Sequence, residues 1–151
     1  MSDDFEKVRE RVRASFSKQT IMSTIGATIE SIEPGEVIIQ LPFSDKISQQ
    51  DGFVHAGVIT TIVDSACGYA AMTLMPEDAR VLTIEFKSNF TAPAIGEVFT
   101  AIGVVKKPGR TVMVSTGEVY AGNASNNCRE QSEMGKLISL MQASMMVIKP
   151  S

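Results

Sequence analysis

Cysteine is scarce in this 151-residue sequence, which contains only Cys67 and Cys128. Two cysteines cannot build the multi-bridge disulfide framework of a small secreted domain, and they are too few for a cysteine-rich metal site. A glycine-rich dinucleotide-binding motif is missing as well. These shortages predict a protein of the reducing cytoplasm that uses no metal and no cofactor. Cys67 lies in an apolar stretch, where an unreactive thiol is expected.

Concentrated positive charge is also absent. The formal net charge is −3, and the longest basic cluster is the Lys106-Lys107 pair with Arg110 nearby. This pattern argues against a broad nucleic-acid-binding surface. The longest apolar run contains Asp64 and several polar residues, and the N-terminal residues are charged. We therefore expect no signal peptide, and neither nucleic acid nor a membrane among the partners.

The composition is that of a globular domain. Hydrophobic residues make up 44% and charged residues 21% of the sequence, and its length suits one domain with its own core. Apolar side chains in residues 1–20 recur at a spacing of three or four, which predicts an amphipathic helix. They are Phe5, Val8, Val12 and Phe16. We expect a single domain over residues 1–151, with this helix on its surface.

The segment from Val58 to Met75 predicts a buried helix, because it is apolar on most sides and too long for a typical strand. Asp64 is its one acidic side chain, and neighbours on the same helical face, such as Gly57 and Gly68, are small. A carboxylate in a buried helix is costly unless it is paired, hydrogen-bonded or protonated. Asp64 is therefore either a functional carboxylate or a structural residue that lies at the helix edge, is solvated, or is bonded to a neighbouring Thr or Ser.

Six further segments predict β-strands, because they are rich in β-branched residues and bounded by turn residues. They are residues 21–32, 37–41, 81–90, 97–106, 111–120 and 136–148. Periodicity alone would also allow a helix for the last segment, but its place after hairpin-linked strands favours a strand. In residues 81–90, strict alternation predicts one face with Leu82, Ile84, Phe86 and Ser88 and an opposite face with Thr83, Glu85, Lys87 and Asn89.

Short connections between the later strands require antiparallel pairing. An antiparallel sheet has one face to cover, and the apolar helix is the obvious cover. The predicted fold class is therefore α+β, with an antiparallel sheet wrapped around a long central helix, which is the hotdog arrangement.

Two stretches, residues 49–64 and 83–97, resemble the hotdog-fold acyl-CoA thioesterases of the PaaI type. The resemblance covers most of the chain and is most specific at Gly52-Phe-Val-His-Ala-Gly57, with Asp64 seven residues beyond Gly57. The family usually has His-Gly-Gly where this sequence has His55-Ala56-Gly57. Ala56 retains its backbone N–H, so the hydrogen-bond donor is preserved.

The resemblance implies a role for each of four catalytic residues. In the family, the backbone N–H at the Ala56 position binds the thioester carbonyl at a helix N-terminus, where negative charge is stabilised. The Asn or Gln at the Gln49 position helps to bind that carbonyl or the attacking water. The carboxylate at the Asp64 position activates water or attacks directly, and it normally comes from the partner subunit of a dimer. Thr83 aligns with a Ser or Thr that assists.

Three more residues are expected to contact the substrate, namely His55, Gly57 and Gly68. His55 is the only histidine and a candidate general base, but the family histidine generally holds the loop by hydrogen bonds. Glycines at positions 57 and 68 leave room for a substrate next to the helix.

The implied function is hydrolysis of an acyl-CoA to the free acid and CoA by a homo-oligomer, either a dimer or a tetramer. Phe53, Tyr69 and Phe90 permit an aromatic or medium-chain acyl group. A hotdog protein that binds acyl thioesters without cleaving them is one alternative. Asp64 distinguishes the two functions, since hydrolysis needs this carboxylate and binding alone does not. A hotdog dehydratase is a second alternative, but it usually needs an Asp/His pair in a different motif that this sequence lacks.

Overall fold

The computed structural model describes residues 3–125 and 130–151 of the chain, so Cys128 lies outside the described residues. In chain order the elements are α1 (Asp3–Lys18), α2 (Thr20–Ile25), β1 (Thr28–Glu33), β2 (Glu36–Pro42), α3 (Ala56–Met72), β3 (Arg80–Phe90), β4 (Val98–Lys107), β5 (Val112–Gly122) and β6 (Lys136–Ile148). Short 3-10 turns at Asp45–Ile47 and Gln131–Glu133 precede α3 and β6. Within the described ranges, no helix is long and apolar enough to cross a membrane.

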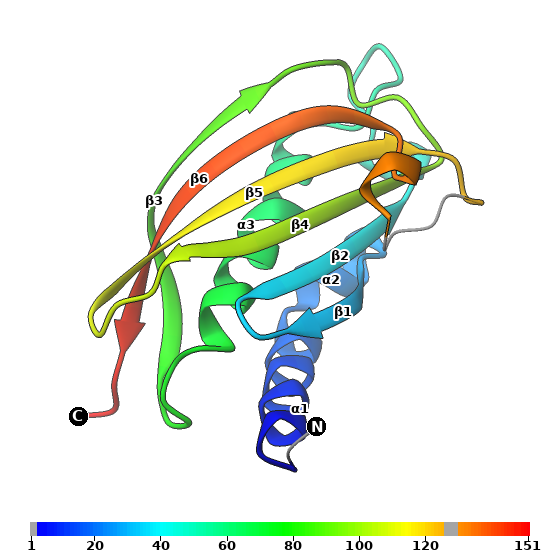
Figure 1. The fold of residues 1–151 in the computed structure, drawn as a ribbon. Helices are drawn as coiled ribbons and strands as arrows, with labels where there is room; N and C mark the ends of the chain where they lie inside the picture. Colours follow the sequence, from blue (N-terminus) through cyan, green and yellow to red (C-terminus); the bar gives the residue numbers. More distant parts are fainter. Residues whose placement is uncertain (1–2, 126–129) are drawn as a thin grey trace.

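The six strands form one antiparallel sheet in the order β1-β2-β4-β5-β6-β3. Figure 1 shows the sheet curving around α3, with α1 and α2 on the same side of the sheet as α3. This arrangement confirms the predicted hotdog fold. It also leaves β1 and β3 as the two edge strands, and β3 is the edge that runs alongside α3.

α3 lies close against the centre of the sheet because two strand glycines face it. A Cβ on Gly103 of β4 would lie 2.3 Å from the backbone of Ala66, and one on Gly117 of β5 would lie 2.4 Å from the side chain of Val63. A larger residue at either position would have to push the helix away, since protein cores are tightly packed. The two glycines therefore fix the depth at which α3 sits in the curved sheet.

Arg11 of α1 ties the N-terminal helix to the C-terminal end of α3. Its guanidinium donates hydrogen bonds to the carbonyl oxygens of Met72 at 2.6 Å, Met75 at 3.2 Å and Pro76 at 2.7 Å. Carbonyls at a helix C-terminus lack intrahelical donors, and the helix dipole favours a cation there. Val12, the next residue of α1, is fully buried. The second half of α1 is therefore held against the C-terminal part of the central helix.

The expectation of a strand beginning at Ile21 was wrong for its first half. Residues Thr20–Ile25 form α2, which ends where Gly26 adopts a left-handed conformation with φ of 85° and its N–H bonds to the carbonyl of Met22. Burial of Met22 and Ile25 outweighs the weak β preference of this segment. The strand β1 begins only at Thr28.

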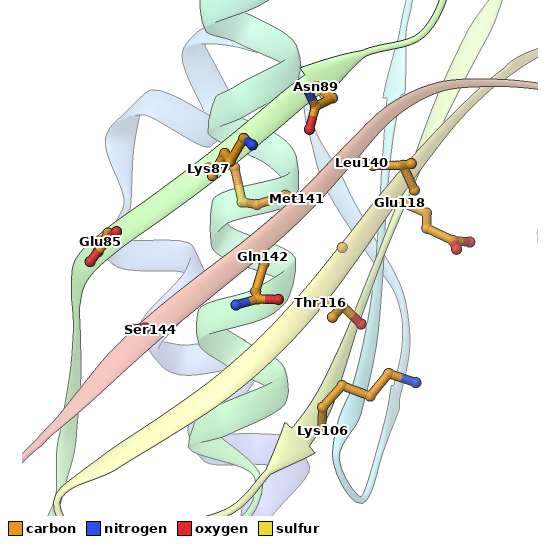
Figure 2. A pocket seen from close by; sticks show the side chains of 11 residues that line it. Glu85, Lys87, Asn89, Lys106, Thr116, Glu118, Leu140, Met141, Gln142 and Ser144 are labelled. Atoms are coloured by element: carbon orange, nitrogen blue, oxygen red, sulfur yellow. The ribbon is translucent and has the colours of Figure 1, made fainter.

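Strict alternation along β3 was also wrong, because the strand contains a bulge at Ile84. Thr83 pairs with Met145 and Glu85 pairs with Ser144, so Ile84 is an extra residue without a partner. A bulge of one residue reverses which face later side chains occupy. Thr83 consequently points toward α3. Glu85 and the alternate residues after it point to the outer face of the sheet (Figure 2).

Candidate active site

The side chain of Gln49 holds the loop that leads into α3. Its Oε1 accepts hydrogen bonds from the backbone N–H of Asp51 at 2.6 Å and of Phe53 at 3.2 Å. The turn is completed by a bond from the Gly52 N–H to the Gln49 carbonyl at 3.1 Å, with Gly52 at a φ of 86°. The Nε2 amide of Gln49 has no hydrogen-bond acceptor among the described residues. It remains the free donor of this side chain.

His55 is the N-cap of α3, and its Nδ1 accepts a hydrogen bond of 2.8 Å from the N–H of Gly57. An accepting Nδ1 requires the neutral ring with its proton on Nε2. The Gly57 N–H is therefore already occupied. At the start of α3, the Ala56 N–H has no acceptor among the described residues. Ala56 is exposed and lines a small cavity of about 180 Å³ together with Gln49.

Asp64 lies two turns further along α3 and is held by Thr83 of β3. The Thr83 hydroxyl lies 2.8 Å from Oδ1 of Asp64 and 3.3 Å from the sulfur of Met145. Burial raises the pKa of the Asp64 carboxyl above its ordinary value, and the hydrogen bond from Thr83 partly opposes that rise. Asp64 is thus a half-buried carboxylate of fixed orientation that binds a proton more readily than an ordinary aspartate.

A cavity of about 430 Å³ opens beside Asp64. Its floor is formed by α3, where Gly68 is buried and a Cβ would come within 3.9 Å of Val81. Cys67 is adjacent to Gly68 in sequence but is buried, and burial together with the Asp64 charge raises the pKa of its thiol to about 12. The thiol is therefore protonated and unreactive at neutral pH.

The structure separates the predicted site residues into two groups. Gln49, His55, Ala56 and Gly57 lie at the start of α3, whereas Asp64, Gly68 and Thr83 surround the larger cavity. Ala56 and Asp64 are eight residues apart in one helix, which corresponds to about 12 Å. The two groups of predicted site residues therefore lie about two helical turns apart in one protomer.

One wall of the Asp64 cavity comes from residues that the sequence did not indicate. Ser15, Lys18 and Gln19, at the end of α1, line it opposite residues of β3. Gln19 donates to the Tyr69 hydroxyl at 2.8 Å and accepts from Ser65 at 3.3 Å. These contacts join positions almost fifty residues apart, and no local spacing marks them in the sequence.

A cavity of about 700 Å³ lies on the outer face of the sheet and contains none of the predicted site residues. Figure 2 shows polar side chains of neighbouring strands, including Lys87, Gln142 and Lys106, pointing away from α3. The predicted site residues that line a cavity therefore line cavities other than this one. Among residues 3–125 and 130–151, no three His, Cys, Asp or Glu side chains are grouped as a metal site would require.

Comparison with known proteins identifies the family. Residues 51–126, half of the chain, match the sequence profile of the thioesterase superfamily. A thioesterase family protein from Silicibacter pomeroyi is 43% identical, with a TM-score of 0.86 over 95% of this chain and 99% of that chain. The E. coli PaaI protein from the phenylacetic acid degradation operon is 16% identical and shares the fold, with a TM-score of 0.80 over 97% of this chain and 96% of that chain. A 1,4-dihydroxy-2-naphthoyl-CoA hydrolase from Listeria monocytogenes is 28% identical over 94 residues, which are 62% of this chain and 76% of that protein. The chain therefore belongs to the thioesterase superfamily and is a thioesterase with the hotdog fold of the PaaI type.

Proposed function

We propose that the protein hydrolyses the thioester of an acyl-CoA to the free acid and CoA, with Asp64 as the catalytic carboxylate. The observation that carries this proposal is the pairing of Asp64 with Thr83 at 2.8 Å beside an open cavity. A general base works best when its pKa lies close to the working pH, and burial moves the pKa of Asp64 upward in that direction. The relative from Listeria that bears a CoA hydrolase name supports the choice of thioester.

We assign one active site to two protomers. One protomer supplies the free N–H of Ala56 and the amide of Gln49, and the other supplies Asp64 and Thr83. The separation of about 12 Å along α3 supports this division, since one protomer cannot place both groups on the same carbonyl. The site is therefore complete only in a homodimer or a larger homo-oligomer.

The edge strand β3 is the surface that we assign to the dimer contact. It has eleven residues and exposes Leu82, Ile84, Phe86 and Phe90, each of which is about half accessible. A long apolar edge strand promotes association with another chain. Pairing of two β3 edges would also bring Thr83 and Asp64 next to the partner subunit, because β3 runs alongside α3.

The proposed reaction is a hydrolysis with Asp64 as general base. Asp64 takes a proton from a water molecule, whose oxygen attacks the thioester carbon. The carbonyl oxygen becomes negatively charged and is stabilised by the Ala56 N–H, the helix dipole and the Gln49 amide. The carbon–sulfur bond breaks, and the CoA sulfur leaves with the proton from Asp64. Thr83 keeps the carboxylate in place through both proton transfers.

The acyl group in this proposal is aromatic or of medium length. Phe53 and Phe90 line the cavity at Ala56, and Tyr69 lines the cavity at Asp64, so apolar surface is present on both sides of the reacting carbonyl. Apolar walls with a few fixed polar groups are typical of small-molecule sites. The cytoplasmic location expected from the sequence stays a prediction.

A panel of acyl-CoA thioesters tests the function directly. Release of free CoA thiol is followed for aromatic, medium-chain and short-chain members, and binding of non-hydrolysable thioether analogues is measured in parallel. Hydrolysis of at least one aromatic or medium-chain member is the expected result. Tight binding of the analogues without hydrolysis of any panel member would replace this proposal with that of a non-catalytic acyl-thioester-binding protein.

A further inference from the structure

Two cationic side chains line the cavity beside Asp64. Three charged side chains line this cavity, and besides Asp64 they are Lys18 and Arg80, both exposed. Within residues 3–125 and 130–151, neither cation has a carboxylate within ion-pair distance. By contrast, Arg9 is paired with Glu6 at 3.2 Å. The cavity is therefore bordered by two cations that form no ion pair within the described residues.

The two cations come from different elements and border the same space. Lys18 is the last residue of α1, and Arg80 is the first residue of β3. Asp64 and Gly68 of α3 lie on the floor that both cations border. Elements from separate parts of the chain thus bring two positive charges to the border of one cavity.

The wall next to Lys18 is fixed by hydrogen bonds. Gln19 bonds through its amide nitrogen to the Tyr69 hydroxyl at 2.8 Å and through its oxygen to the Ser65 hydroxyl at 3.3 Å. Ser15 lies 3.3 Å from the same Tyr69 hydroxyl. Because Ser65 directly follows Asp64, this network places the end of α1 at a set position relative to the carboxylate. The polar atoms of this network bond to one another and not to the ammonium group of Lys18. That group is therefore available for a ligand.

We propose that Lys18 and Arg80 form a binding site for an anionic group of the thioester substrate. This inference rests on the proposed function, because it takes the Asp64 cavity as the place where the substrate binds. Two parts of an acyl-CoA have the required chemistry. One is a carboxylate at the far end of the acyl group, and the other is a phosphate of CoA. Arginine and lysine bind both groups through charge-assisted hydrogen bonds.

A purely structural role for Lys18 makes a different prediction. A cation in the last turn of a helix interacts favourably with the helix dipole, and this affects stability without affecting ligand binding. Arg80, at the start of an edge strand, has no equivalent helix. A binding role therefore requires that both residues affect the same ligand, whereas the dipole role affects only Lys18 and only the unfolding transition.

Binding of non-hydrolysable CoA thioethers, measured by titration calorimetry on the intact oligomer, tests the proposal without depending on catalysis. Four probes are needed: a carboxylate-ended and a methyl-ended thioether of equal chain length, each as the CoA form and as the pantetheine form without phosphates. The variants are Lys18→Met, Arg80→Met and the double variant. Lys18→Arg and Arg80→Lys keep the charge, and Lys136→Met removes an exposed lysine that does not line this cavity.

The double variant is expected to bind the anionic probe about two- to thirty-fold more weakly, from two partly exposed ion pairs. The charge-keeping variants and Lys136→Met should bind like the wild type, and the loss should shrink at high salt. A loss confined to carboxylate-ended probes assigns the site to the acyl group. A loss confined to the CoA forms assigns it to a phosphate.

Equal binding of all four probes by the double variant and the wild type would overturn the proposal. Failure of the proposed function has a different signature, because absence of hydrolysis with every panel member leaves the binding measurements intact. Loss of anionic-probe binding in that case would still support the anion site. A lowered melting temperature of Lys18→Met with unchanged binding would assign Lys18 to the helix dipole alone and also count against the site.

Discussion

The hydroxyl of Thr83 lies 2.8 Å from Oδ1 of Asp64 and joins the edge strand β3 to the central helix beside the open cavity. The bond does two things to the carboxylate. It fixes the orientation of the group, and it favours the charged form against the effect of burial. Thr83, which supplies this bond, directly precedes the bulged residue Ile84. A backbone irregularity therefore lies next to the candidate catalytic carboxylate.

Replacing Asp64 with Asn should lower turnover of acyl-CoA by a factor of about a hundred to ten thousand, the usual cost of losing a general base. Asn keeps the size of the side chain and its ability to bond with Thr83. Binding of a thioether analogue should change little. Turnover at the wild-type rate, with the same oligomer size, would make Asp64 a structural residue.

The same substitution should not destabilise the protein at neutral pH. The pKa of Asp64 is raised in the folded state, so the stability that this group contributes is present at low pH and is lost as pH rises through the raised pKa. A neutral Asn avoids the cost of a buried charge at neutral pH. Chemical denaturation at pH 7 should therefore give Asp64→Asn an unfolding free energy equal to or above that of the wild type.

Replacing Thr83 with Val should move the acid limb of the pH–rate profile to higher pH. Asp64 must be deprotonated to act, so activity falls as pH drops through its pKa. Loss of the hydrogen bond from Thr83 removes the contribution that lowers this pKa, and the pKa rises further. Thr83→Ser keeps the hydroxyl and should leave the limb in place. An identical limb in Thr83→Val would mean that another group controls it.

Replacing Ala56 with Pro removes one N–H at the position proposed to bind the carbonyl oxygen. Ala56 is the first residue of α3, where proline is well tolerated, and His55 before it has a ψ of 136°, which suits a residue preceding proline. Turnover should fall by a factor of about a hundred to a thousand, as for other lost oxyanion donors. Ala56→Gly retains the N–H and is the matched control. Full activity of a folded Ala56→Pro protein would exclude this donor.

Mixing two inactive variants tests the division of the site between protomers. Asp64→Asn and Ala56→Pro chains, unfolded together and refolded, should form mixed dimers with one site that carries neither change. Random pairing of equal amounts should restore about a quarter of the wild-type activity. No recovery would be expected if each protomer held a complete site.

Light scattering on the wild type should show a dimer or a tetramer, and an active monomer would contradict the assignment.

Replacing Gln49 with Ala should lower turnover less than Asp64→Asn does, because the amide positions a group without supplying a proton or a charge. The loop should also lose order, since the Oε1 atom of Gln49 accepts two backbone hydrogen bonds. Circular dichroism and melting temperature separate the loss of order from the loss of a donor. An equal or larger loss of turnover in a protein with unchanged melting would reverse the ranking of the two residues.

The sequence predicted the central helix, the sheet and the hotdog arrangement because these depend on hydrophobic periodicity and on short connections, which are local properties. It failed at Ile21, where burial of Met22 and Ile25 decided between helix and strand. The prediction failed again along β3, where a bulge changes the register. The local sequence alternates as in a regular strand and does not mark the bulge. In both places contacts with distant parts of the chain determined the outcome.

The same distinction separates the site residues. The group from Gln49 to Gly57 is contiguous, so a motif can carry it. The bond between Asp64 and Thr83 was not predicted, since only a neighbouring Thr or Ser was considered as a partner for Asp64 and Thr83 was aligned only by resemblance. The wall from Lys18 and Gln19 was not predicted at all, since it depends on how α1 folds back over α3.

The extra residue in β3 gives the chain a length requirement that is separate from any requirement on residue type. Ile84 has no partner on β6 and about half of its surface is exposed, so other apolar side chains that suit the proposed dimer contact could occupy the position. Removing the residue altogether is a different matter. A one-residue deletion there would rotate Glu85 and Lys87 inward, or else pull Thr83 off the side of the strand that meets Asp64. Alignments of this region should therefore tolerate substitution at position 84 and reject gaps, which is a constraint on spacing that a comparison of residue identities alone would overlook.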